Sequence, residues 1–390
     1  MVLKITNGTC LSGTKAERTN IYIKDGIIEN VTKEDLLYDR IIDAEGMYVS
    51  PGFIDIHVHG GGGYDFADGT LNDIKKAAFA HALHGTTTIF PTSASMSFED
   101  TLKFIKNVKL AVRENRPGHP FIAGSHLEGP YFAQSMRGAQ NPEYIKEPKK
   151  EEYTRFIEEG EGSVTRMSFA PELKGAADLC RYLKSKNVVT AYAHTEACYE
   201  EIKPVLDLGC RIATHLYSGM ETVTRKNGLR RLGGVETAFL EDDIYCEVIA
   251  DGMHLPVNLL KLIYKLKGSD KICLITDAMR GAGMEDGYSV LGPKNDGVKC
   301  IVKNGVAYLE DMQAFAGSVC TSDRLVRVMH KSAEIPLCDC IKMMCENPAK
   351  VMGLKDRGKI EKGLRADLVI FDDNINIKKV IIEGGELKPF

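Results

Sequence analysis

The sequence lacks any long apolar run and any recognisable export signal. No stretch approaches the roughly 18 apolar residues that a membrane-spanning helix needs. The opening segment, MVLKITNGTCLSGTKAERTN, has neither the basic flank nor the apolar core of a signal peptide. We therefore expect a soluble, cytoplasmic protein that has no membrane partner.

Basic charge and paired cysteines are also missing. The 390 residues carry a formal net charge of −4, which leaves no positive field for nucleic acid, so any anionic ligand must be held by local charge. The 11 cysteines include no CxxC pair, and the tightest group, Cys338, Cys340 and Cys345, has no histidine among them. An odd number of scattered cysteines indicates reduced thiols in a cytosol rather than a disulfide framework.

Both ends of the chain have the pattern of short strands. Residues 2–8, 20–31 and 40–50 are β-like, and Asp25-Gly26 is a typical hairpin turn. Strand patterns return in GKIEKGLRADLVIFDD and IKKVIIEGGEL. Because chain termini commonly lie close together, we expect residues 1–50 and 355–390 to form one small β-sandwich domain.

The middle of the chain, residues 51–354, alternates short apolar strands with longer amphipathic segments, which predicts parallel strands joined by crossover helices. Helical segments are expected at 71–84, 175–186, 198–209 and 257–268, and again within 321–351, after a β-rich insertion near 285–315. The pattern predicts a (β/α)8 TIM-like barrel. Its eight strands are expected at residues 53–59, 86–92, 121–130, 164–172, 188–195, 210–218, 244–252 and 271–278.

Polar residues gather at the carboxyl ends of these strands, where barrel enzymes build their sites. His57 and His59 are two residues apart, so they point to the same side of one strand, and four glycines follow that let the backbone turn sharply. Other strands end in Glu128, His194, His215 and Asp277. The six side chains would satisfy two divalent cations with a bridging carboxylate, and imidazole with carboxylate favours zinc, iron or manganese.

The remaining histidines divide into two groups. His254 follows the seventh strand and could donate a hydrogen bond to a substrate oxygen. His126 lies two residues before Glu128, so it either supports a metal ligand through a hydrogen bond or only packs in the interior. Surface or packing roles are expected for the others, which are His81, His84, His119 and His330.

Several motifs in one order give the chain a family resemblance. PGFIDIHVHG, HLEGPY, AHTEA, THLYSGM, ADGMH and LITDAM are followed by AGS at 316–318, NPAKVMGL and KGLRADLVIFD. Over nearly its whole length the sequence resembles the N-acetylglucosamine-6-phosphate deacetylases of the amidohydrolase superfamily. A lone HxH pair would be weak evidence, but the ordered set is specific.

The resemblance implies that Glu128, His194 and His215 hold the metal common to the family and that Asp277 is the catalytic acid and base. His57 and His59 match members that hold a second metal, so one or two ions are expected. Water activated by metal would attack the acetyl carbonyl, His254 would stabilise the oxyanion, and Asp277 would pass the proton to the leaving amine. The expected products are acetate and an amino sugar phosphate, and the expected assembly is a homodimer.

The phosphate contacts depart from the family pattern. Relatives commonly have NAM after the sixth-strand histidine, where this chain has Ser218, Gly219 and Met220, so one backbone donor is kept and the asparagine side chain is not. The following TRKNGLRR offers four basic residues, of which we favour Arg225 or Arg230 as the phosphate contact, because guanidinium matches phosphate geometry. Gln140 is expected to contact the sugar or the phosphate.

Three other functions stay open at this point. The substrate could be the galactosamine or mannosamine isomer, since the departure from the family pattern at the phosphate contacts affects substrate recognition more than the hydrolytic groups. A different amidohydrolase acting on cyclic amides or N-acyl amino acids would share the histidines, but HLEGP and the absence of a lysine in FAPE, at the end of the fourth strand, argue against it. A non-catalytic metal-binding or ligand-binding barrel would be expected to have lost Asp277.

Overall fold

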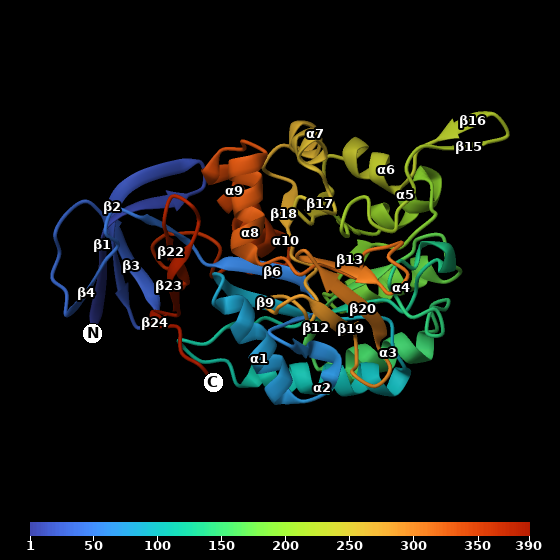
Figure 1. The fold of residues 1–390 in the computed structure, drawn as a ribbon, viewed down its shortest axis with the longest axis horizontal. Coiled ribbons are helices and arrows are strands. Elements are labelled where there is room, and N and C mark those ends of the chain that lie inside the picture. The colour runs from blue at the N-terminus through green and yellow to red at the C-terminus, as the bar shows by residue number, and fades with distance from the viewer.

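The computed structural model describes residues 1–390, and its elements form a strand-and-helix barrel with a β-rich unit on one side (Figure 1). None of the ten α-helices is both long and apolar enough to cross a membrane. The N- and C-termini both lie with the β-rich unit. This arrangement leaves the opposite side of the barrel free for loops and insertions.

One sheet formed from both ends of the chain makes the small unit. Its strands are β1 (Val2–Ser12), β2 (Lys15–Lys24), β3 (Ile27–Thr32), β4 (Arg40–Asp43), β5 (Tyr48–Pro51), β22 (Leu368–Phe371), β23 (Ile377–Ile382) and β24 (Gly385–Glu386). The order is β24-β23-β22-β5-β1-β2-β3, and β4 pairs with β1. The predicted turn at Asp25-Gly26 joins β2 to β3, where Lys24 pairs with Ile27. The unit expected to be a β-sandwich is thus built from one continuous hydrogen-bonded sheet, and it has an apolar cluster of its own.

Eight parallel strands at the predicted places form the barrel wall. They are β6 (Phe53–Val58), β9 (Thr86–Ser93), β11 (Ser125–Glu128), β12 (Val164–Phe169), β13 (Val189–Tyr192), β14 (Ile212–Ala213), β17 (Tyr245–Val248) and β18 (Ile272–Leu274), with the short β10 (Phe121–Ile122) beside β9. The barrel prediction is confirmed. We propose 1–50 with 355–390 and 51–354 as the domain boundaries.

The barrel closes between its first and last strands through contacts at the site end. The backbone N–H of Asp277 donates to the carbonyl of His57 (2.9 Å), and the N–H of His59 donates to the carbonyl of Ala278 (2.8 Å). Below them, the Thr276 hydroxyl donates to buried Asp55 (2.5 Å). The strands that carry His57 and Asp277 are therefore fixed to each other.

Helices cover the outside of the barrel. They are α1 (Leu71–Ala82), α2 (Phe98–Arg113), α3 (Lys150–Gly160), α4 (Ala176–Ser185), α5 (Tyr199–Asp207), α6 (Gly234–Leu240), α7 (Val257–Lys267), α8 (Ser322–Arg327), α9 (Leu337–Met344) and α10 (Glu346–Val351). Short turns of helix are η1 (Phe66–Asp68), η2 (Gln134–Met136) and η3 (Val328–Ser332). The helices and the outward strand residues share the main apolar cluster, which extends through Phe53 and Phe371 to the small unit.

The barrel interior is layered. Along three strands an apolar residue is followed two positions later by a polar one, which points to the same side. These pairs are Phe90 and Thr92, Ile212 and Thr214, and Tyr245 and Glu247. The three apolar members belong to one buried cluster. An apolar plug thus supports a polar layer, which in turn lies beneath the site.

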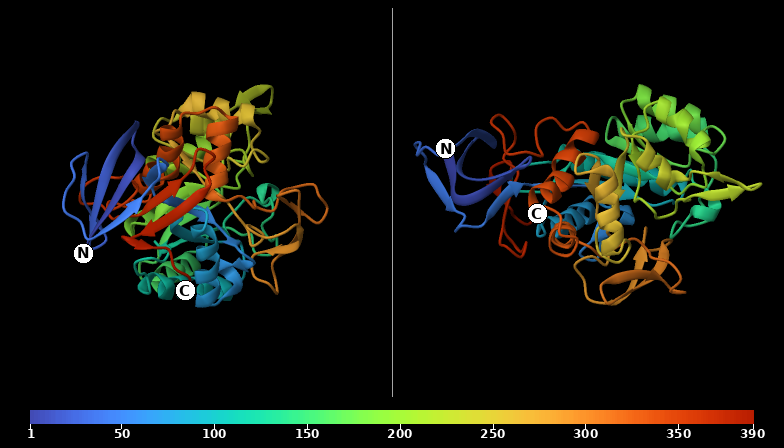
Figure 2. Two further views of the ribbon diagram at one scale, coloured as in Figure 1. Left: turned by 60° about the vertical axis from the view of Figure 1, so that its left-hand side comes forward. Right: turned by 90° about the horizontal axis from the view of Figure 1, so that it is seen from above.

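Two insertions project from the barrel (Figures 1 and 2). The first is the hairpin of β15 (Thr224–Lys226) and β16 (Leu229–Arg231), and the second is the antiparallel sheet of β19 (Gly287–Leu291), β20 (Val298–Lys303) and β21 (Val306–Leu309). The second lies where the β-rich insertion is expected, and Leu291 reaches the cavity described below.

Candidate metal centre and active site

His57 and His59 lie where β6 ends and the glycine-rich turn begins. The turn pairs β7 (Gly60–Gly61) with β8 (Tyr64–Asp65). A side chain at Gly61 would come within 2.7 Å of His81 Nε2, and the same nitrogen lies 2.7 Å from the Gly60 carbonyl. Burial lowers the pKa of His81 to about 4, so it is a neutral donor that holds the turn. His81 is therefore a buried hydrogen-bond donor to the turn after His59, and it belongs to neither candidate metal-ligand group.

Glu128 at the end of β11 is the centre of the site. Its Oε1 lies 2.9 Å from His215 Nε2, 3.2 Å from His194 Nε2 and 3.5 Å from His57 Nε2, and its Oε2 lies 3.3 Å from His59 Nε2. His194 and His215 stand at positive φ (45° and 28°), just after β13 and β14, where the backbone leaves the strand and aims both rings inward. Four imidazoles from three strand ends and one loop thus converge on one buried carboxylate.

The donor set fits divalent metal. Two groups have all their ligand atoms within 4.8 Å of one another, one made of His57, His59 and Glu128 and the other of Glu128, His194 and His215. His57 Nε2 is buried without a hydrogen-bond partner. Burial opposes charge on His57, yet the negative Glu128 and Asp277 raise its pKa to about 9, so the cluster attracts a cation. Its residues suit a metal such as zinc or iron better than magnesium.

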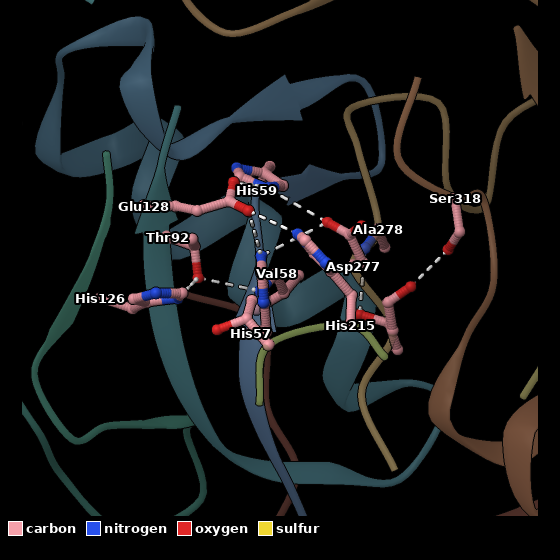
Figure 3. A network of polar contacts seen from close by, with 12 residues as sticks. His57, Val58, His59, Thr92, His126, Glu128, His215, Asp277, Ala278 and Ser318 are labelled. Carbon is pink, nitrogen blue, oxygen red and sulfur yellow. Dashed lines mark hydrogen bonds and ion pairs between the residues drawn. The ribbon is translucent and has the colours of Figure 1, made fainter. Parts of the chain in front are cut away.

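Asp277 faces the same cluster from the end of strand β18. Its Oδ1 lies 3.2 Å from His59 Nε2 and 3.5 Å from His57 Nε2 (Figure 3). Its carbonyl accepts from the N–H of Ser318 (2.8 Å), and a side chain at Gly317 would come within 2.9 Å of that carbonyl, which explains the glycine of AGS. Burial favours the neutral acid, but His57 and His59 hold the pKa of Asp277 below its usual value. Asp277 is therefore a carboxylate.

His254 faces the cavity from the loop after β17. Asp251 accepts a hydrogen bond from its Nδ1 (2.8 Å) and from the backbone N–H groups of residues 253 and 254. Burial alone would raise the pKa of Asp251, but the hydrogen bond from His254 lowers it. Phe315 packs on the His254 ring, with centroids 4.5 Å apart. The imidazole is thus held from two sides.

A cavity of about 300 Å³ opens above the cluster, large enough for a small ligand. Ser218 and Gly219 line it, as do apolar Leu291 and Phe315 from the second insertion and the chain after it. Gln140 also lines it, but its amide donates to Glu128 Oε2 (2.7 Å), so Gln140 contacts the carboxylate at the centre of the histidine cluster as well as the cavity.

Arg225 and Arg230 are not brought into this cavity. They face each other across the β15–β16 hairpin, where both are exposed, and no lysine or arginine of the chain lines the cavity. Arg231 turns back to contact Glu200 and Cys198. The sequence places the basic run correctly after a site strand, but it does not reveal that the run forms a projecting hairpin.

Three residues that support the site were not predicted from the sequence. Buried Glu247 and Arg166 form an ion pair inside the barrel, and Asp251 holds His254. A charged residue on the inward face of an apolar strand, as in IYCEV and VTRMSF, is the signal that would have identified Glu247 and Arg166.

His126 packs edge-on against His57, with ring centroids 4.7 Å apart, and forms a hydrogen bond with Ser168 (2.7 Å), so it supports the His57 ring (Figure 3).

A parallel barrel with histidines and carboxylates at its strand ends defines a metal-dependent hydrolase of the amidohydrolase class. The model of the Amidohydrolase family matches residues 48–387, and the chain belongs to this family.

Within this family, the chain is similar to deacetylases of N-acetylated amino sugar phosphates. The chain is 31% identical to N-acetylglucosamine-6-phosphate deacetylase of Bacillus subtilis, over 93% of this chain and 91% of the relative. It is 28% identical to N-acetylgalactosamine-6-phosphate deacetylase of Escherichia coli O157:H7, over 93% of each. The crystal structure of N-acetyl-D-glucosamine-6-phosphate deacetylase from Mycobacterium smegmatis superposes with a TM-score of 0.90 at 30% identity and covers all of both chains.

Proposed function

We propose that this chain hydrolyses the N-acetyl group of N-acetylglucosamine 6-phosphate, giving glucosamine 6-phosphate and acetate. The observation that carries the proposal is the cluster of four imidazoles around Glu128, with the Asp277 carboxylate beside it and a cavity above. Relatives of this name match nearly the full chain.

We assign one divalent ion to Glu128, His194 and His215 and a second to His57, His59, Glu128 and Asp277, with zinc, iron or manganese as candidates. When bound, such an ion makes water a nucleophile near neutral pH and polarises the acetyl carbonyl. Asp277 Oδ1 accepts the proton of the attacking water and delivers it to the amine nitrogen as the C–N bond breaks. His254, held by Asp251, donates a hydrogen bond to the carbonyl oxygen as negative charge develops.

We place the sugar phosphate across the cavity, with Gln140, Ser218 and Gly219 as its contacts. The phosphate still needs a cation, and we assign it to Arg225 or Arg230 of a second copy in a homodimer. Two arginines directly opposite each other repel unless an anion joins them. Leu229 on the same hairpin is 74% exposed, which favours burial of the hairpin against another chain.

Mixing variants tests the arginine assignment. Arg225→Ala and Arg230→Ala, made separately, should raise KM for the phosphorylated substrate and leave the unphosphorylated sugar unaffected. If the arginine acts across the dimer, mixing the impaired variant with Asp277→Asn chains should restore activity, because one site of each mixed dimer is then complete. Unchanged KM in both variants would remove these arginines from the phosphate site.

A second substrate is supported by the E. coli relative, whose name specifies the galactosamine isomer. The mannosamine isomer would need the same hydrolytic groups. A cytoplasmic location is our proposal, supported by the 11 free cysteines.

Acetate release from purified protein tests the function. The substrates are N-acetylglucosamine 6-phosphate, its galactosamine and mannosamine isomers and unphosphorylated N-acetylglucosamine, before chelation and after zinc, iron or manganese is restored. We expect metal-dependent release that is fastest with the glucosamine phosphate. Release confined to another isomer would correct the substrate, and no release by metal-loaded protein would reject the function.

A further inference from the structure

Glu247 contacts both metal-ligand groups from beneath. It lies on β17, its side chain is fully buried, and it belongs to the polar layer inside the barrel. Its Oε2 lies 3.2 Å from His57 Nδ1 and also accepts a hydrogen bond from the backbone N–H of His215 (3.3 Å). One carboxylate oxygen therefore fixes the ring of one ligand and the backbone of another.

Arg166 anchors this carboxylate. It pairs with Glu247 Oε1, donates from Nη1 to the carbonyl of Ile56 (3.1 Å) and donates from Nη2 to the hydroxyl of Thr214 (3.2 Å). Ile56 and Thr214 are the residues immediately before His57 and His215. The buried pair thus connects four strands directly below the ligands, and Glu247 cannot turn away from His57 without losing its own charge partner.

The contact determines which His57 nitrogen carries hydrogen. Because Glu247 is a carboxylate paired with arginine, it only accepts hydrogen bonds, so His57 Nδ1 must be the N–H. In the neutral ring, the form that binds a metal, Nε2 is then the free lone pair, and it points at Glu128 and Asp277, each 3.5 Å away. His59 lacks such support, since its Nδ1 is buried without a partner.

We infer that Glu247 is a positioning residue that presents His57 Nε2 as a ligand and thereby controls whether the group of His57, His59 and Glu128 binds its ion. The inference rests on the proposed metal chemistry. A buried ion pair adds little net stability compared with apolar residues of similar volume, and this one lies directly beneath the ligands, where its contacts orient them. His194 is oriented separately, by the carbonyl of Met136 (2.7 Å), and the ion at Glu128, His194 and His215 should depend less on Glu247.

Zinc binding to chelated protein, with bound metal counted by mass spectrometry, tests the inference. Wild type should bind two zinc ions per chain. Glu247→Gln, and the double variant Arg166→Met with Glu247→Gln that avoids an unpaired buried arginine, should keep one ion and bind the second about 10–100-fold more weakly. Asp367→Asn is the matched control, because it disrupts another buried arginine–carboxylate pair, with Arg357 (3.1 Å), outside the site.

A second readout needs no metal. Long-range proton–nitrogen NMR of the histidine rings in chelated protein, recorded above the His57 pKa of about 9 so that the ring is neutral, should show hydrogen on Nδ1 of His57 in wild type and a changed or mixed tautomer in the double variant. His57→Gln identifies the signals. Two ions bound with wild-type affinity, equal weakening of both, or an unchanged tautomer would overturn the inference. If the predicted zinc and NMR results hold but wild type releases no acetate, the proposed function fails and the inference stands.

Discussion

Asp277→Asn is the sharpest test of the reaction. The substitution keeps the shape of the side chain and removes its charge and its ability to accept a proton. The backbone bonds that position residue 277, to the carbonyl of His57 (2.9 Å) and from the N–H of Ser318 (2.8 Å), do not involve the side chain and should persist. The proposed ligands Glu128, His194 and His215 are untouched, so at least one ion should stay bound.

The expected loss follows from the ionisation of Asp277. Although burial opposes its charge, His57 and His59 hold its pKa below the usual value, so the wild-type group is a proton acceptor at neutral pH and asparagine is not. A positioned general acid or base contributes about 10²–10⁴-fold. We therefore predict a fall in kcat of that size, or about 3–5 kcal/mol of transition-state stabilisation, with KM changed by about threefold or less.

Three measurements decide the outcome: acetate release, metal content and calorimetric binding of the unhydrolysed substrate. Asp286→Asn serves as control, since Asp286 is an exposed carboxylate on the second insertion. Turnover within tenfold of wild type would remove the proton-transfer role from Asp277. A loss of activity matched by loss of both ions would show that the residue acts only as a ligand.

Three further predictions concern other parts of the molecule. Asp251→Asn should lower kcat about 10–100-fold with little change in KM, because His254 loses the carboxylate that holds it as a donor; kinetics against pH would detect this, and an unchanged kcat would contradict it. Phe371→Ala should cost about 3–5 kcal/mol in urea unfolding, since this fully buried ring packs against Tyr48 and Phe53 between the two units, and kcat should not change. For His81 the pKa in the folded protein is about 4, below the pKa of 6.5 in the unfolded chain, so the unfolded chain binds more protons between these two pH values. The free energy of unfolding should therefore fall as pH drops from 6.5 to 4, by at most about 3 kcal/mol. The same pH series on His81→Gln should lack this part of the loss.

The barrel and the convergence of its strand-end histidines and carboxylates were predictable for one physical reason. Parallel strands buried on both faces are apolar runs, and a polar residue just after each run must lie at the same rim. That argument needs no contact between distant residues. It placed His57, His59 and Glu128 together without knowledge of the loops between them.

The supporting residues were harder to predict because their partners lie on other strands. Glu247 and Arg166 satisfy each other across the barrel, and only the folded sheet brings them together. The same limit applied to Arg225 and Arg230: the sequence identifies a basic run, but it does not show that the run forms a hairpin that carries both side chains away from the cavity.

The sheet formed from both chain ends also sets an order of events during synthesis. Strand β5 pairs with β22, whose first residue, Leu368, bonds opposite Pro51. A ribosome adding about 5–20 residues per second needs on the order of 15–60 s between these two strands. During that interval β5 lacks its neighbour β22, so the N-terminal part of the sheet exposes a strand edge, a surface that promotes aggregation. This edge is covered only when the end of the chain has been made, after the whole barrel has emerged. Until then, nascent copies can aggregate through the exposed strand edge.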